Sequence, residues 1–88
     1  MIMRLLLTTK IWKEGKHYVA YTPELDIASQ GKNFLHAEER LREAVNIFIE
    51  ETKRLGTFEE VMRTSGFSRR ERHWEPPLIS IYSLEVAV

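Results

Sequence analysis

The first part of the chain alternates between apolar runs and turn-forming residues, which predicts an antiparallel sheet. Residues 3–12 are rich in Leu, Ile, Thr and Trp, and residues 17–21 are β-branched and aromatic. The polar, Gly-containing turn at 13–16 separates these runs, as in a β-hairpin. Pro23 cannot donate to a ladder, so the second strand ends just before it. Residues 25–30 predict a short third strand.

The following segment has the three- and four-residue periodicity of an amphipathic helix. Asn33 is expected to cap this helix, and Gly56 to end it after about Leu55. Ile47 and Ile49 flank the apolar stripe, which indicates either a broad core face or one flank that meets a partner chain. The expected stripe consists of Phe34, Ala37, Leu41, Ala44, Val45, Phe48, Thr52 and Leu55.

A second, shorter helix and a final strand are predicted after the main helix. Thr57 and Glu60 have the spacing of a capping box at the start of the second helix. Residues 68–75 are charged and Arg-rich, and the two prolines that follow stiffen the chain into an extended form. Residues 78–88 are apolar and β-prone, which predicts the last strand.

The last predicted strand changes phase at Ser83. Strict alternation places Ile79 and Ile81 on one face and the later apolar residues on the other. A bulge explains this change, and so does a strand whose halves pack on two protomers. A long apolar strand with an open edge is an aggregation hazard, which pairing with another subunit removes. We therefore expect a homo-oligomer, at least a dimer, whose interface includes Leu84, Val86 and Val88.

Composition and charge narrow the class of protein. The 88 residues suit a single domain over 1–88, with 43% hydrophobic and 30% charged residues. The absence of Cys excludes a disulfide framework, a thiolate zinc site and a Cys nucleophile. The apolar start is too short for a signal peptide, and no stretch approaches the ~18 apolar residues that span a bilayer. We expect a cytoplasmic protein without membrane contact.

The sequence lacks a recognisable catalytic or metal-binding set. The three histidines share no metal-ligand spacing, and no Ser lies in a GxSxG elbow. Glu24 and Asp26 would leave the same face of an extended strand, where a solvated edge is favoured over a metal site or a shared proton. We therefore expect no enzyme activity, no metal and no cofactor.

The Arg-rich segment mixes cations with an aromatic side chain. Arg69, Arg70, Arg72 and Trp74 have the chemistry to grip a phosphate backbone and stack a base. Two glutamates interrupt the segment, and the formal net charge of the whole chain is zero. A solvated or salt-bridged loop is therefore the favoured interpretation, with nucleic acid or an acidic protein partner as the alternatives.

Residues 13–31 resemble the signature of the HicB-like antitoxin family. They contain a Gly-containing turn, the run YVAYTPEL at 18–25 and the turn SQG at 29–31, followed by a helix with EAV at 43–45. The Trp and two prolines at 74–77 and the residues 83–88 resemble the tails of shorter, stand-alone members. The resemblance covers most of the chain, and the order and spacing of its elements are more specific than any one of them.

The resemblance implies an α+β fold in the order β-β-β-α-α-β, with a small antiparallel sheet on one main helix. Such a fold is described as a reduced ribonuclease-H-like core. The implied function is an antitoxin that binds and sterically occludes a small HicA-type toxin that cleaves mRNA, or an orphan relative of such antitoxins. Members form dimers or higher oligomers. No recognition helix follows the last predicted strand, so we do not expect direct DNA binding.

Three functional hypotheses follow, and the antitoxin-like protein is the leading one. The alternative is a nucleic-acid-binding accessory protein that uses Arg69–Trp74. A hydrolase derived from the ribonuclease-H core comes third, because residues 3–12 contain no acid to hold catalytic metals.

For the antitoxin-like protein, we expect the turn after the second strand to contribute to partner binding. It combines a stiff Pro with an aromatic and an acid suited to a basic toxin. The competing interpretation, slightly favoured, is a purely structural turn. The expected partner-binding residues are Tyr21, Pro23, Glu24 and Leu25.

Overall fold

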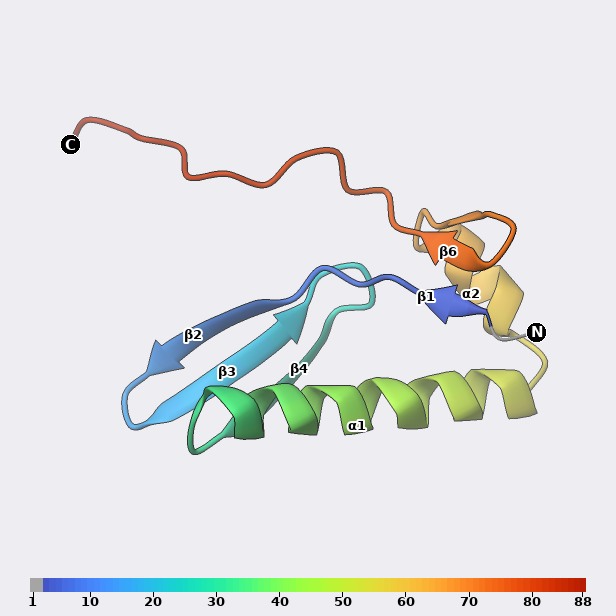
Figure 1. The fold of residues 1–88 in the computed structure, drawn as a ribbon, viewed down its shortest axis with the longest axis horizontal. Coiled ribbons are helices and arrows are strands. Elements are labelled where there is room, and N and C mark those ends of the chain that lie inside the picture. Colours follow the sequence, from blue (N-terminus) through green and yellow to red (C-terminus); the bar gives the residue numbers. More distant parts are fainter. Residues whose placement is uncertain (1–2) are drawn as a thin grey trace.

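A computed structural model describes residues 3–88 and shows an α+β fold (Figure 1). Within these residues there are two helices and two three-stranded sheets. No helix in this range is long and apolar enough to cross a membrane. The elements in chain order are β1 (Arg4–Leu5), β2 (Lys10–Glu14), β3 (His17–Thr22), β4 (Ile27–Gly31), α1 (Phe34–Arg54), α2 (Phe58–Thr64), β5 (Ser68–Arg69) and β6 (His73–Glu75).

The larger sheet is the antiparallel meander β2-β3-β4, which confirms the predicted hairpin. Glu14 pairs with His17 across a two-residue turn, where Gly15 has a φ of 62°. A side chain at that φ is disfavoured, so Gly suits the turn. The third strand starts at Ile27 and not at residue 25, because a turn closed by a hydrogen bond from the Asp26 N–H to the Pro23 carbonyl occupies the preceding residues.

Helix α1 begins and ends where the sequence predicts. The Asn33 side chain accepts a hydrogen bond from the His36 N–H at 2.9 Å. The His36 ring in turn accepts one from the Lys32 N–H at 3.0 Å, so two backbone donors at the helix start are satisfied reciprocally. Gly56, with a φ of 75°, follows the C-cap residue Leu55.

Helix α1 lies along one face of the larger sheet, in close contact with it (Figure 1). A Cβ added to Gly31 would lie 2.3 Å from the backbone nitrogen of Ala37, so only Gly permits this approach. Two of the four buried residues between helix and sheet are alanines, which suits this close approach. We call these four residues and the side chains packed on them the sheet–helix cluster; its buried members are Ala20, Ala37, Leu41 and Val45.

The ends of the predicted helical stripe are not in the core. Phe34 and Leu55 are exposed, although the periodicity placed them on the buried face. Twenty-one helical residues extend about 30 Å, whereas strands of five or six residues extend about 20 Å, so the C-terminal end of the helix, which Leu55 follows, projects beyond the sheet (Figure 1). Ile49 packs against the sheet–helix cluster, whereas Ile47 is 67% exposed.

The smaller sheet has the order β1-β6-β5, and β1 runs parallel to β6. It corrects the prediction of one antiparallel sheet whose first strand spans 3–12. That run divides into β1 and β2, and residues 6–9 connect the two sheets. The Thr8 N–H donates to the Glu24 carboxylate at 2.9 Å, which holds this connection to the β3–β4 turn.

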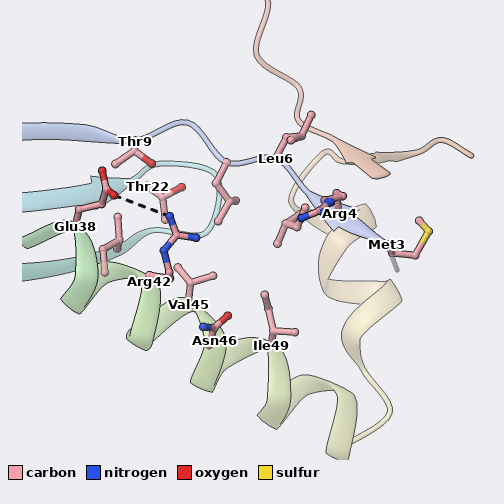
Figure 2. A pocket seen from close by; sticks show the side chains of 13 residues that line it. Met3, Arg4, Leu6, Thr9, Thr22, Glu38, Arg42, Val45, Asn46 and Ile49 are labelled. Carbon is pink, nitrogen blue, oxygen red and sulfur yellow. Dashed lines mark ion pairs between the residues drawn. The ribbon is translucent and has the colours of Figure 1, made fainter. Parts of the chain in front are cut away.

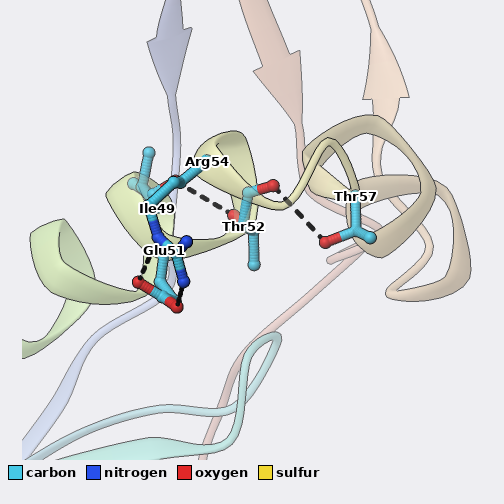
Figure 3. Close-up of polar contacts among 5 residues, drawn as sticks. All are labelled: Ile49, Glu51, Thr52, Arg54 and Thr57. Atoms are coloured by element: carbon cyan, nitrogen blue, oxygen red, sulfur yellow. Dashed lines mark hydrogen bonds and ion pairs between the residues drawn. The ribbon is translucent and has the colours of Figure 1, made fainter.

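The Arg-rich segment is a short β5–β6 hairpin and not a loop. With α2 and β1 it encloses a second cluster of large side chains, Met62, Phe67 and Trp74, which we call the Trp74 cluster. The predicted capping box is not formed, because Thr57 makes no side-chain capping hydrogen bond to α2. Its hydroxyl instead donates to the Thr52 carbonyl at 3.4 Å, at the corner between the helices (Figure 3).

Residues 78–88 form neither helix nor strand, which contradicts the predicted last strand. All of them are exposed, and Figure 1 shows them leaving β6 on the side of the molecule away from α1. β-propensity reflects fit to a paired, half-buried surface, so an apolar segment becomes a strand only beside a partner edge. We call residues 78–88 the apolar segment.

Candidate functional site

The β3–β4 turn contains the residues expected to bind a partner, and two of them are engaged inside the chain. The Glu24 carboxylate accepts hydrogen bonds from the Thr8 N–H at 2.9 Å and from the Thr22 hydroxyl at 3.2 Å. Leu25 packs against both hydrophobic clusters, and Pro23 is half-buried. These contacts are those of a structural turn, the interpretation that the sequence slightly favoured.

Tyr21 and Asp26 form the accessible polar pair of this turn. The Tyr21 hydroxyl donates to the Asp26 carboxylate at 2.8 Å. This hydrogen bond is the main cause that raises the pKa of Tyr21, with further contributions from desolvation and from the charges of Asp26 and Glu24. Sequence reasoning did not expect Asp26 here, because it placed this residue on a strand. The positive φ of 54° that puts Asp26 in the turn is tolerated by Asp better than by most residues.

The two carboxylates of the turn therefore accept hydrogen bonds from different groups of the chain. Glu24 points to Thr8 and Thr22, whereas Asp26 points to Tyr21. The prediction that both leave the same face of a strand was wrong, because they lie in a turn. Among residues 3–88, no group of three or more His, Asp or Glu side chains is arranged to hold a metal ion.

The face of the larger sheet opposite α1 carries an aromatic pair. Ala20 packs against α1, so strand alternation directs its neighbours Val19 and Tyr21 to the opposite face. Trp12 pairs with Val19 in the β2–β3 register and is 43% exposed. The rings of Trp12 and Tyr21 meet edge to face, with centroids 6.4 Å apart. We call this surface the open sheet face; alternation along β2 and β3 would have identified it from the sequence.

Trp74 is not available to stack a base. Its side chain is 6% exposed and meets the ring of Phe58 edge to face, with centroids 6.1 Å apart. This burial corrects the hypothesis that Trp74 contributes to a nucleic-acid surface. The indole ring provides the apolar area that the short strands of the smaller sheet lack, so folding places it inside.

The arginines of the hairpin have neighbours of their own. Arg69 lies over the Trp74 ring, 6.0 Å from its centroid, and forms an ion pair with Glu59 at 3.5 Å. Arg70 donates to Glu75 at 2.7 Å, and this hydrogen bond is the main cause that lowers the pKa of Glu75. Arg72 is exposed. The ion pairs agree with the salt-bridged interpretation of the segment.

A groove separates α1 from residues 3–9, with a volume of about 590 Å³ (Figure 2). Leu5 and Leu7 line it from one side, and Leu41, Val45 and Ile49 from the other. The charged residues in its lining are Arg4, Arg42 and Glu38, and the last two form an ion pair at 3.9 Å. Sequence reasoning missed this groove, because it arises where the two sheets meet.

The apolar segment contains seven of the 13 exposed large hydrophobic residues of the described chain. Ile79 is 98% exposed, and the three residues predicted to form an oligomer interface, Leu84, Val86 and Val88, are exposed as well. The open sheet face, the groove and the apolar segment are therefore the candidate binding surfaces. Comparison of the chain with protein-family models, with curated proteins and with solved structures found no match.

Proposed function

We propose that this chain is a cytoplasmic, antitoxin-like protein of the HicB type that binds and sterically occludes a small HicA-type toxin, or an orphan relative of such antitoxins. It acts as a homo-oligomer and not as an enzyme. The resemblance over residues 13–31 supports this proposal, because those residues build the β2–β3 hairpin, the β3–β4 turn and β4. The meander on one long helix is also consistent with the reduced ribonuclease-H-like sheet that the resemblance implies.

The observation that carries the proposal is the open sheet face. It displays Trp12 beside Tyr21, and Tyr21 is bonded to the exposed carboxylate of Asp26. Aromatic side chains that are part exposed, with a hydrogen-bonding end, are enriched in protein interfaces. A neighbouring carboxylate adds attraction for a basic partner, as an RNA-cleaving toxin would be. The toxin therefore docks on the open sheet face, with Tyr21 as a direct contact.

The other residues of the turn have a supporting role in this proposal. Glu24 holds the turn against Thr8, Leu25 packs against the two clusters, and the Pro23 carbonyl closes the turn by accepting the Asp26 N–H. They position Tyr21 and Asp26 without having to touch the partner themselves.

Nucleic acid is a weaker candidate partner. The Trp74 ring is buried, and Arg69 and Arg70 face carboxylates of the same chain. A phosphate backbone would have to displace those carboxylates before it bound. We therefore propose a structural role for the Arg-rich segment 68–75.

The test is to purify the tagged full chain from its native cells and to identify the proteins that accompany it. A recovered small protein that cleaves mRNA, and whose cleavage stops when the chain is added in equal amount, is the expected result. Recovery of no such protein, or undiminished cleavage in the complex, would refute the toxin-binding role.

A matched pair of variants tests the docking surface. Trp12→Ala should weaken inhibition about 10-fold or more, since buried aromatic anchors dominate interface energies. Ile47→Ala removes an exposed apolar side chain from α1 and should leave inhibition unchanged. Equal effects of the two substitutions would exclude the open sheet face as the docking surface.

A further inference from the structure

The edge of β1 that faces away from β6 is open beside an apolar groove. The N–H groups of Arg4 and Leu6 donate to the carbonyls of Arg72 and Trp74, so strand alternation directs the backbone groups of Leu5 to the opposite edge. Within residues 3–88, β1 pairs with β6 alone. An unpaired edge next to apolar side chains is the arrangement that accepts an added strand.

The apolar segment has the composition of such a strand. Leu84, Val86 and Val88 alternate with Glu85 and Ala87, so one face of an extended strand would be apolar. The phase change at Ser83 puts Ile79 and Ile81 out of step with that face. A strand with one apolar face would therefore begin at Leu84, and the six residues 78–83 would form an arm that reaches roughly 20 Å when extended.

The segment of the same chain is poorly placed to fill this groove. Strand β6 already occupies one edge of β1, so residues 78–88 would have to cross residues 6–9 to reach the other edge. Figure 1 shows them leaving β6 on the side away from α1, whereas the groove lies between β1 and α1. A second copy of the chain approaches the groove without this crossing.

We propose that residues 84–88 of a second copy add as a strand to the open edge of β1. Leu84, Val86 and Val88 then lie in the groove against Val45 and Ile49 of α1. Reciprocal exchange of the two segments gives a two-fold symmetric dimer. This inference rests on the proposed self-association and is independent of the toxin partner.

Charge complementarity supports this arrangement. Leu5 packs in the Trp74 cluster, so Arg4 leaves the opposite face of β1. Paired strands have the same two faces. An added strand whose Val86 lies on the same face as Leu5 therefore has Glu85 on the same face as Arg4. Glu85 is the single charged side chain in residues 78–88. Two arginines line the groove; Arg42 forms an ion pair with Glu38, whereas Arg4 does not.

Sedimentation equilibrium of the full chain at micromolar concentration is the first test. A dimer is expected, and a monomer would overturn the proposed self-association together with this inference. Val86→Asp should raise the dimer dissociation constant at least about 100-fold, because it would bury an unpaired charge in each of the two grooves. Ile79→Asp makes the same change in the arm and should have a small effect. An unchanged dimer of Val86→Asp would show that another surface joins the copies.

Charge reversal tests the groove itself. Glu85→Arg and Arg4→Glu should each weaken the dimer about 10-fold, since the contact occurs twice per dimer. The double variant should return to within about threefold of the original chain. Glu71→Arg and Lys16→Glu are matched controls elsewhere on the surface and should leave dimerisation unchanged. Failure of the double variant to recover would overturn the docking at β1 while leaving self-association intact.

Discussion

The sheet–helix cluster and the Trp74 cluster are built in opposite ways. The first lies between strands of five or six residues and a helix of 21 residues, and its buried side chains are two alanines, a valine and a leucine. The second lies among strands of two or three residues and a seven-residue helix, and three large side chains fill it. Leu25 and Leu7 pack against both clusters and connect them.

This difference shows two routes to stability in one small chain. Where helix and sheet are long, their backbones approach closely around the short side chains of Ala20 and Ala37, and Gly31 is the residue that permits this approach. Where the strands are short, few ladder hydrogen bonds form, and the burial of Trp74, Phe67 and Met62 has to hold the elements. A loss of side-chain volume should therefore lower the free energy of unfolding most in the Trp74 cluster. In the sheet–helix cluster, a substitution that pushes the helix and sheet backbones apart should have the larger effect.

The largest expected effect is in the Trp74 cluster. Trp74→Ala should lower the free energy of unfolding by about 3–5 kcal/mol, since it leaves a cavity among Met62, Phe67 and Phe58. Trp74→Phe, which retains an aromatic ring, should lower it by less. Urea denaturation followed by circular dichroism measures both. A loss below about 1 kcal/mol for Trp74→Ala would contradict the dependence of this region on large side chains.

A smaller but distinct effect is expected at the sheet–helix contact. Gly31→Ala should lower the free energy of unfolding by an amount near the upper end of about 1–3 kcal/mol, because the new Cβ meets the backbone of Ala37, which no rotamer change relieves. The exposed neighbour Gln30→Ala should stay within about 0.5 kcal/mol. Thermal and urea denaturation compare the two variants, and equal stabilities would show that the helix does not depend on this approach.

The two helix starts should differ by a smaller amount. Asn33→Ala should cost about 1 kcal/mol, because the side chain caps the N–H of His36 at the start of α1. Thr57→Ala should cost less, since Thr57 makes no capping bond to α2. Equilibrium denaturation of the two variants under identical conditions is the measurement. A larger loss for Thr57→Ala would mean that the helix corner, and not the cap, determines stability there.

The smallest effects are expected in the pH dependence of two exposed pairs, one in each region. The hydrogen bond to Asp26 raises the pKa of Tyr21 in the folded chain. The contribution of this hydrogen bond to the free energy of unfolding is therefore present below the ordinary tyrosine pKa, and it is lost as pH rises through the raised pKa of the folded state. The hydrogen bond from Arg70 lowers the pKa of Glu75 in the folded chain. The contribution of this hydrogen bond to the free energy of unfolding is therefore present above the ordinary glutamate pKa, and it is lost as pH falls through the lowered pKa of the folded state.

Two substitutions separate these contributions. Asp26→Asn should lower the Tyr21 pKa toward its ordinary value, as followed by ultraviolet titration; Asn also tolerates the positive φ at this position. Arg70→Ala should raise the Glu75 pKa toward its ordinary value, as followed by NMR titration of the carboxyl group. Unshifted titrations in both variants would show that these contacts are not maintained in solution.

Much of the fold was predictable from local residue patterns. The hairpin at Gly15, the cap at Asn33 and the helix end before Gly56 each depend on residues close in sequence, and the structure confirms all three. The candidate surfaces were predictable to different degrees. The face that carries Trp12 and Tyr21 follows from alternation along two predicted strands, whereas the groove exists because two sheets meet at residues 6–9.

The errors concern segments whose structure depends on distant partners. Residues 3–12 and 78–88 both have strand composition, yet the first divides between two sheets and the second forms no strand. Trp74 lies in a charged segment, so its neighbours in sequence indicate a surface residue although it is buried. In each case the local composition indicates the intrinsic preference of the segment. The distant residues that determine its structure are not visible in that local pattern.

The sequence by itself determined the elements whose signals are local: the turns, the caps and the amphipathic helix. Backbone sterics and hydrogen bonds between near neighbours act before any tertiary contact forms. Tertiary structure alone decided that Arg4 would pair in parallel with His73, that Trp74 would be enclosed and that Glu24 would hold Thr8. These contacts join residues far apart in the chain, and they stabilise the fold only after the chain has brought both partners together, at the cost of its conformational entropy.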